Sequence, residues 1–296
     1  MSHRRAVALM VLATLLWSIA GVVTRHLEAA RSFEVTFWRS LFNALSLLAI
    51  LVPLRGAALF RDILRGDRTI WFSGLCWALM YTAFMVALTL TSVANVLVAM
   101  SSGPLLTALF ARIFLGHRLP GRTWGAIAAA ALGIGWMFGA DAAGDASGSS
   151  LLGTLVALGV PLGSSANFTL LQHAASQVRG SSARQDMLPA VLLGAILSAA
   201  LALPLAWPLQ ASAHDLGLLA LLGTVQLAIP CLLVVRLSRE LPATELALLA
   251  LLEVIFGVLL AWVGAGEAPS GSTLAGGAMV LAALVANHLG GQVPRR

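Results

Sequence analysis

The sequence predicts an all-α polytopic membrane protein with ten transmembrane helices, built as two inverted five-helix repeats. Three observations lead to this fold class: an apolar composition, ten separate apolar runs, and a pattern that returns after 150 residues. Apolar residues make up 59% of the 296 residues, charged residues make up 10%, and the mean hydropathy is +0.92. These values lie far outside the averages of soluble domains. No stretch is long and polar enough to form a separate soluble domain.

The apolar runs are about as long as a helix needs to cross the hydrocarbon core, which takes roughly 20 residues. They cover residues 6–23, 33–52, 70–88, 94–114 and 123–139, then 151–171, 187–206, 216–235, 243–263 and 274–289. Residues 140–150 separate the fifth run from the sixth and are rich in Gly and Ser, as in a flexible linker. We therefore expect one repeat over residues 1–139, an external linker over 140–150 and a second repeat over 151–296.

The two halves repeat each other most clearly around the fourth and ninth runs. Several residues of the first half recur as the same type 150 positions later, among them Leu109, Ala111, Gly116, Gly121 and Thr123. Glu253 stands in the second copy opposite Gly103, so one copy carries a carboxylate at membrane depth. Five spans per half force the second half to enter the membrane upside down. Inverted repeats of this kind hold a substrate site at mid-membrane between the halves.

The arginines predict which side each loop faces. The chain has 18 arginines and no lysine. With the amino terminus inside, fifteen of them lie at cytoplasmic ends of the runs and three, Arg25, Arg31 and Arg39, lie on the opposite side. Cytoplasmic loops carry an excess of positive charge, so we expect both termini in the cytoplasm. The replacement of all lysines by arginine, together with abundant alanine, indicates a GC-rich bacterial genome and therefore a bacterial inner membrane. The first run is expected to be a retained span, because its removal as a signal peptide would destroy the five-plus-five symmetry.

The residue inventory argues against several function classes. Without lysine the chain can form neither a P-loop nor a Schiff base to retinal or pyridoxal phosphate. Cys76 and Cys231 lie inside apolar runs, where free cysteines behave as small hydrophobes, and their spacing fits no metal site. No paired carboxylates, His cluster or nucleophile arrangement indicates an enzyme. We expect no catalysis, no cofactor, no metal and no nucleic-acid partner.

Short motifs give the chain a resemblance to the EamA-type family of the drug/metabolite transporter superfamily, over essentially its whole length. They are Trp17-Ser18, Pro104, Gly125, Gly133, Glu253 and Gly266-Glu267. The chain departs from the family pattern at His117, where Glu is expected, and at Val254, where Pro is expected. Within the family it is most similar to the aromatic amino-acid exporters of the YddG type. The resemblance implies an export carrier whose first, third, fourth, sixth, eighth and ninth spans surround a central cavity.

An aromatic stripe in the third run is a candidate wall for that cavity. Trp77, Tyr81 and Phe84 recur at helical spacing and share one face, with Met80 beside them. This face could stack against an aromatic or apolar substrate, with the Tyr81 hydroxyl as a polar handle. The alternative is that these side chains only pack against lipid or other helices. Tyr81 is the single tyrosine and lies at the centre of its run, which favours the binding role.

The remaining candidates for the cavity are aromatic or polar residues inside four other runs. They are Trp17, Ser18, Asn95, Ser101, Ser164, Asn167 and Gln226. In the sixth run Pro161 is flanked by glycines, and backbone groups freed at such a break must face protein or a water-filled cavity. Small and hydroxyl residues also mark helix packing in membranes, which is the alternative for Ser18. The small residues of the fifth and tenth runs indicate close packing or dimerisation, so we expect a monomer or a weak homodimer.

Glu253 is the outlier, because a carboxylate at mid-span costs roughly 3 kcal/mol on insertion scales. It should face the interior, where it could bind a substrate amine or accept a coupling proton; a structural carboxyl bonded to backbone is the alternative. These features predict a secondary transporter that exports small metabolites, foremost aromatic or other apolar amino acids, by alternating access. A channel-like facilitator, or an exporter of other compounds such as nucleosides or drugs, is the alternative.

Overall fold

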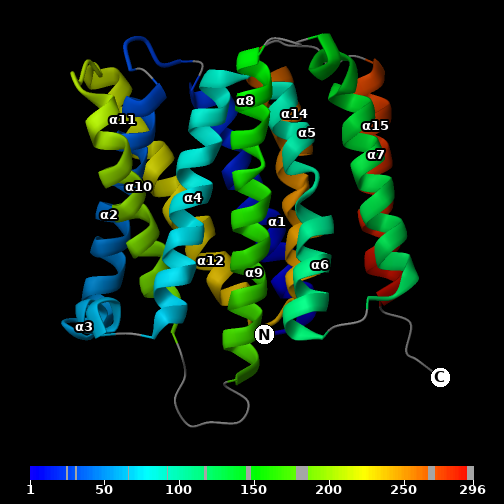
Figure 1. The fold of residues 1–296 in the computed structure, drawn as a ribbon, viewed down its shortest axis with the longest axis horizontal. Coiled ribbons are helices and arrows are strands. Elements are labelled where there is room, and N and C mark those ends of the chain that lie inside the picture. The colour runs from blue at the N-terminus through cyan, green and yellow to red at the C-terminus, as the bar shows by residue number, and fades with distance from the viewer. Residues whose placement is uncertain are drawn as a thin grey trace.

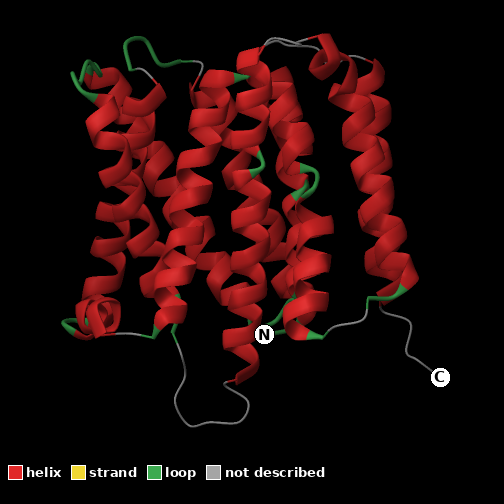
Figure 2. Cartoon of the chain, viewed as in Figure 1, coloured by secondary structure: helices red, strands yellow, loops and turns green. Residues whose placement is uncertain are grey.

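The computed structural model of the chain is a bundle of helices that stand side by side (Figures 1 and 2). It describes residues 1–24, 26–30, 32–65, 67–91, 93–116, 119–144, 148–177, 186–265 and 271–291. Every regular element in these ranges is helical, which confirms the all-helical fold. Seven helical segments are long and apolar enough to cross a bilayer, so the chain is a polytopic membrane protein.

The first half contains three continuous long helices, one broken one and one more long helix. The continuous helices of the first three runs are α1 (His3–Thr24), α2 (Ser32–Arg55) and α4 (Arg68–Leu90). The fourth run is divided into α5 (Val93–Met100) and α6 (Gly103–Leu115), and α7 (Gly121–Gly144) follows. Between α2 and α4 lies the short helix α3 (Ala58–Arg65), which the apolar runs did not indicate.

The second half also has five runs, but more of them are divided. Its first run is divided into α8 (Gly148–Ala157) and α9 (Gly159–Gln177), and α10 (Leu188–Ala206) is continuous. The eighth run consists of α11 (Ala213–Leu221), a π-helical turn η2 (Leu222–Ala228) and α12 (Ile229–Leu237). The ninth is divided into α13 (Ala243–Ala250) and α14 (Leu252–Ala265), and α15 (Gly271–Gly291) is the last.

Two helix breaks occur at equivalent places in the halves. An offset of 150 residues carries the bounds of α5 onto those of α13. In the first copy Pro104 occupies the first turn of α6, where its missing N–H leaves no helical bond unmade. In the second copy no proline is present, and the chain instead makes tight turns from the Leu251 N–H to Leu248 O at 3.1 Å and from the Val254 N–H to Leu251 O at 3.1 Å.

One end of the bundle is basic. The amino terminus, α3 and the last turn of α15 all lie at the lower end in Figure 1. The helix ends and turns at this end carry Arg4, Arg5, Arg55, Arg61, Arg68, Arg112, Arg122, Arg236 and Arg239. Arg39 corrects the expectation from sequence, because it does not lie at the opposite surface. Its side chain is 2% exposed and lies inside the bundle, on the inner face of α2.

Glycines let particular helices approach each other closely. A Cβ atom at Gly194 of α10 would lie 2.3 Å from the Cβ of Trp77, so only glycine allows α10 to pack this tightly on α4. At Gly223 of η2 a Cβ would lie 2.7 Å from the backbone oxygen of Arg39. In the same way a Cβ at Gly133 of α7 would lie 2.7 Å from the Gly276 oxygen of α15. The first two contacts hold Trp77 and Arg39 in place around the interior of the bundle.

Candidate functional site

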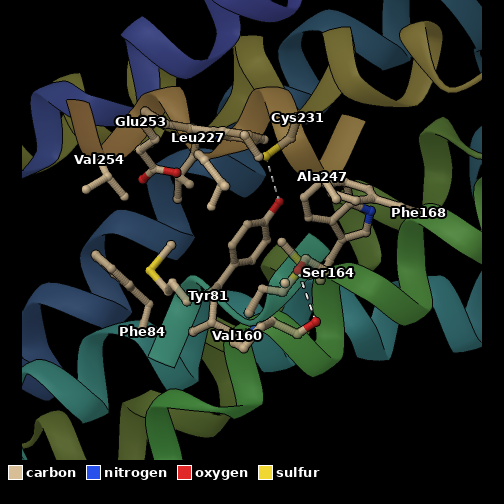
Figure 3. A pocket seen from close by; sticks show the side chains of 18 of the residues that line it. Tyr81, Phe84, Val160, Ser164, Phe168, Leu227, Cys231, Ala247, Glu253 and Val254 are labelled. Carbon is tan, nitrogen blue, oxygen red and sulfur yellow. Dashed lines mark hydrogen bonds between the residues drawn. The ribbon is translucent and has the colours of Figure 1, made fainter. Parts of the chain in front are cut away.

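A cavity of about 110 Å³ lies among helices of both halves (Figure 3). Its wall contains eight of the residues that the sequence indicated: Trp17, Trp77, Met80, Tyr81, Phe84, Ser164, Gln226 and Glu253. They come from α1, α4, α9, η2 and α14, which are distant in sequence and meet only through the bundle. Gly103 and Pro104 at the break of the fourth run face the same space.

The aromatic stripe of α4 forms one side of the cavity. The rings of Trp77 and Tyr81 stack with centroids 5.7 Å apart and planes 27° apart. The Tyr81 ring projects into the centre of the view in Figure 3, between Leu227 and Val160. Its hydroxyl donates to Cys231 Sγ at 3.2 Å, and a thiol is a weak acceptor. The Tyr81 hydroxyl, which the sequence suggested as a polar contact for the substrate, is therefore bonded to a weak acceptor. A stronger acceptor on a substrate could replace the Cys231 thiol.

Gln226 is a polar group with unused hydrogen-bonding capacity. Its Nε2 donates to the Trp17 backbone oxygen at 3.2 Å, which ties η2 to α1, while its Oε1 has no partner. The residue lies in the π-helical turn, a feature that is frequent at functional sites because it redirects side chains out of the regular ladder. Ser164, by contrast, donates to the Pro161 oxygen of its own helix at 3.2 Å.

Two groups of opposite charge face the cavity. Glu253 lies in the first turn of α14 and is half-buried, and Figure 3 shows its carboxylate on the same side of the Tyr81 ring as Leu227. Arg39 lies on α2, and one of its terminal nitrogens donates to the Tyr81 backbone oxygen at 3.2 Å. Its Nε has no partner. Arg39 and Glu253 lie more than 4.0 Å apart and form no ion pair.

Other predicted cavity residues lie elsewhere. Ser18 Oγ donates to the Leu15 oxygen at 2.7 Å, within its own helix. Asn167 is fully buried, and its Oδ1 accepts from Ser73 Oγ at 2.6 Å, which joins α9 to α4. Ser101 lies in the turn between α5 and α6, off the cavity wall. The side chain of Asn95 lies outside the described part of the chain, as do His117 and Gly266-Glu267.

Sequence reasoning missed several wall residues. Phe168, Leu227 and Cys231 line the cavity, but apolar residues in apolar runs carry no signal that separates lining from packing. Arg39 did carry such a signal. It lies six residues beyond Phe33, where its apolar run begins, which is too deep for a loop residue. A charge at that depth should have been treated like Glu253, as a group that faces the interior.

The comparisons with known proteins agree with this architecture. The model of the EamA-like transporter family matches the chain twice, over residues 4–139 and 151–287. The chain belongs to the EamA-like transporter family. Each matched range of this EamA-like transporter contains one copy of the break that recurs after 150 residues, α5–α6 in the first range and α13–α14 in the second.

Two curated relatives of this EamA-like transporter are the pseudopaline exporter CntI of Pseudomonas aeruginosa strain UCBPP-PA14 and its counterpart in strain PAO1. Each is 25% identical over 287 residues, which covers 96% of this chain and 95% of the relative. One solved crystal structure matches with a TM-score of 0.77 at 20% identity, over 97% of this chain and 98% of the other. This structural match shows that the two chains share a fold.

Proposed function

We propose that this chain is a secondary transporter that exports small metabolites, foremost aromatic or other apolar amino acids, across a bacterial inner membrane. The cavity carries the proposal, because it joins stacked aromatic rings to one carboxylate and one guanidinium. Aromatic walls favour flat apolar groups, and opposite charges favour a zwitterion. The direction of transport rests on the curated relatives, which are named as exporters of pseudopaline.

We further propose ten membrane crossings in two inverted repeats, residues 1–139 and 151–296. Seven long apolar segments are complemented by α5–α6, α7 and α15, which also run along the bundle in Figure 1. The recurrence of helix bounds at 150 residues and the two family matches support the duplication. Five crossings per half invert the second half, and alternating access then follows from rocking one half against the other.

Contacts join the halves at both ends of the bundle and identify what that motion would have to open. At the upper end, the buried carboxylate of Asp215 accepts from the backbone N–H groups of Glu28 at 2.8 Å and Ala29 at 2.9 Å. At the basic end, Asp186 pairs with Arg55 and, at 3.7 Å, with Arg239. Each set joins an element of one half to an element of the other. Alternating access requires that the two sets open in turn.

The orientation is proposed to place both termini in the cytoplasm. Its support is the basic lower end, where the amino terminus and the last turn of α15 lie together. Reporter fusions to each terminus test it, with a cytoplasmic signal expected at both. A periplasmic signal at one terminus only rules out the ten-crossing arrangement, and periplasmic signals at both termini reverse the proposed orientation.

The transport function is tested with purified protein in liposomes. Tryptophan and phenylalanine should show saturable counterflow, and their binding should raise the melting temperature by mass action. Trp77→Ala and Tyr81→Ala should reduce uptake of aromatic substrates more than uptake of small ones. Trp136→Ala is the matched control, because that side chain is 67% exposed on α7 and lies off the cavity wall.

The other results are equally informative. Flux without counterflow identifies a channel-like facilitator. Counterflow of nucleosides or drugs, without counterflow of amino acids, would show that the protein transports those compounds instead. Equal loss for aromatic and small substrates in the Trp77 and Tyr81 variants, at normal expression, means that these rings only pack.

A further inference from the structure

We propose that Arg39 and Glu253 are the two poles of a zwitterion site: the guanidinium binds the substrate carboxylate, and the Glu253 carboxylate binds its ammonium group. The inference rests on the proposed export function and narrows its substrate class. A substrate must then carry both a free carboxylate and a free ammonium group, which α-amino acids do and their amides, amines and nucleosides do not.

The environment of Arg39 leaves its charge uncompensated. Removing a guanidinium from water costs several kcal/mol unless a counter-charge and hydrogen bonds compensate it. Arg39 is 2% exposed, has one bond to a neutral carbonyl, and leaves its Nε–H without an acceptor. Among the described residues no carboxylate lies within ion-pair distance of it. Arg39 lines the cavity and has no counter-charge at ion-pair distance among the described residues, so an anionic ligand in the cavity would compensate its charge.

Arg39 is also held in advance. Its bond to the Tyr81 oxygen fixes one side of the guanidinium to α4. Gly223 lets the backbone of η2 come close to the Arg39 backbone, so α2 has little room to shift. A planar guanidinium fixed in this way offers parallel N–H groups, which match the two oxygens of a carboxylate better than a lysine would.

Glu253 faces the same cavity from the other half of the chain, and no hydrogen bond to it is found within the described ranges. If these two charges compensated each other, they would form an ion pair, and they lie too far apart for that. A ligand with one charge of each sign can bridge the gap. Tyr81 belongs to the same wall, since its backbone oxygen holds Arg39 and both Tyr81 and Glu253 line the cavity.

The test uses four ligands that share an indole ring, measured by calorimetry on the purified full-length protein. Tryptophan has both charged groups, tryptamine lacks the carboxylate, 3-indolepropionate lacks the ammonium group, and indole lacks both. A hydrogen-bonded charged contact corresponds to about 10- to 100-fold in affinity. Wild-type protein should bind tryptophan tighter than tryptamine and tighter than 3-indolepropionate by about this factor each.

The variants assign each pole. Arg39→Gln should lower tryptophan affinity to about that of tryptamine and leave tryptamine binding unchanged. Glu253→Gln should lower tryptophan affinity to about that of 3-indolepropionate and leave the latter unchanged. Arg236→Gln removes an arginine at the basic end, away from the cavity, and should change no affinity. Melting temperatures verify that each variant is folded.

The outcomes separate this inference from the function on which it rests. If wild-type protein binds tryptophan and tryptamine equally, the zwitterion site is wrong while export of aromatic compounds stands. If a folded Arg39→Gln protein still prefers tryptophan over tryptamine, Arg39 is not the carboxylate pole. If wild-type protein binds none of the four ligands, both proposals are overturned. The wild-type series decides the question even if the Arg39 variant does not fold.

Discussion

The broken helices α5–α6 and α13–α14 share a backbone design and differ in chemistry. Both begin with eight helical residues and then turn. The first copy continues with Gly103 and Pro104, the second with Glu253 and Val254, and all four residues line the cavity. The comparison teaches that two segments 150 residues apart can keep the same helix bounds while one cavity-facing position carries a glycine in one and a carboxylate in the other.

The two halves are therefore complementary in charge. The first half supplies Arg39 and the aromatic wall of α4, and the second supplies Glu253 and Gln226. Neither half contains both charges on the cavity wall. A site of this kind forms only when the halves pack together, which is also the condition for a site that alternates between two sides of a membrane.

The largest expected effect comes from removing the charge that distinguishes the ninth run. Glu253→Gln keeps the volume of the side chain and should reduce counterflow of zwitterionic substrates about 10- to 100-fold, because a charged contact in the cavity is lost. Glu245→Gln is the matched control, since Glu245 lies near the basic end and contacts His3 at 3.1 Å. If the Glu253→Gln variant binds and exchanges substrate like the wild type, with the same pH dependence, the role of Glu253 is structural only.

The next effect concerns the seam between the halves. Gly194→Ala would drive a methyl group into Trp77, so it should lower the free energy of unfolding by about 1–3 kcal/mol. Gly21→Ala, also inside a helix, meets nothing within 4 Å and should be neutral or stabilising by up to about 1 kcal/mol. Thermal unfolding in detergent measures both. Equal melting temperatures for the two variants would mean that α4 and α10 are less tightly packed than described.

A smaller effect is expected from making the second break resemble the first. Val254→Pro removes the bond from the Val254 N–H to the Leu251 oxygen and should cost about 1 kcal/mol, with transport retained. Val258→Pro, deeper in α14, should cost about 3 kcal/mol or more, because proline there breaks the helical ladder. Similar losses of stability in the two variants would show that the break after Leu251 does not tolerate proline, unlike the break at Pro104.

The smallest effect is expected at Gly103, the position without a side chain that corresponds to Glu253. It tests whether a side chain is tolerated there. A Cβ at Gly103 would meet only Pro161, at 3.7 Å, which is an ordinary contact. Gly103→Ala should therefore change stability by less than about 0.5 kcal/mol and leave counterflow unchanged. A clear loss of transport at unchanged stability would mean that the ligand approaches the chain closely at this point.

The sequence by itself determined the helices and part of the cavity wall. Bilayer thickness demands long apolar helices, so the ten runs could be located from hydropathy alone. Helical spacing united Trp77, Tyr81 and Phe84 on one face, and the cost of a carboxylate at membrane depth indicated an inward-facing Glu253. The break at Pro104 was visible as a proline, whereas the break after Leu251 could be recognised only through the repeat.

Only the tertiary structure decided which polar groups reach the cavity and which join helices. Asn167 and Gln226 look alike in sequence and both bond a neighbouring helix, yet only Gln226 lines the cavity. Arg39 looked like a charge at the opposite surface and lies instead inside the bundle. The physical reason is that lipid and protein interior are both apolar, so hydropathy does not encode which face of a helix turns inward. That rotation is set by packing contacts such as those at Gly194 and Gly223.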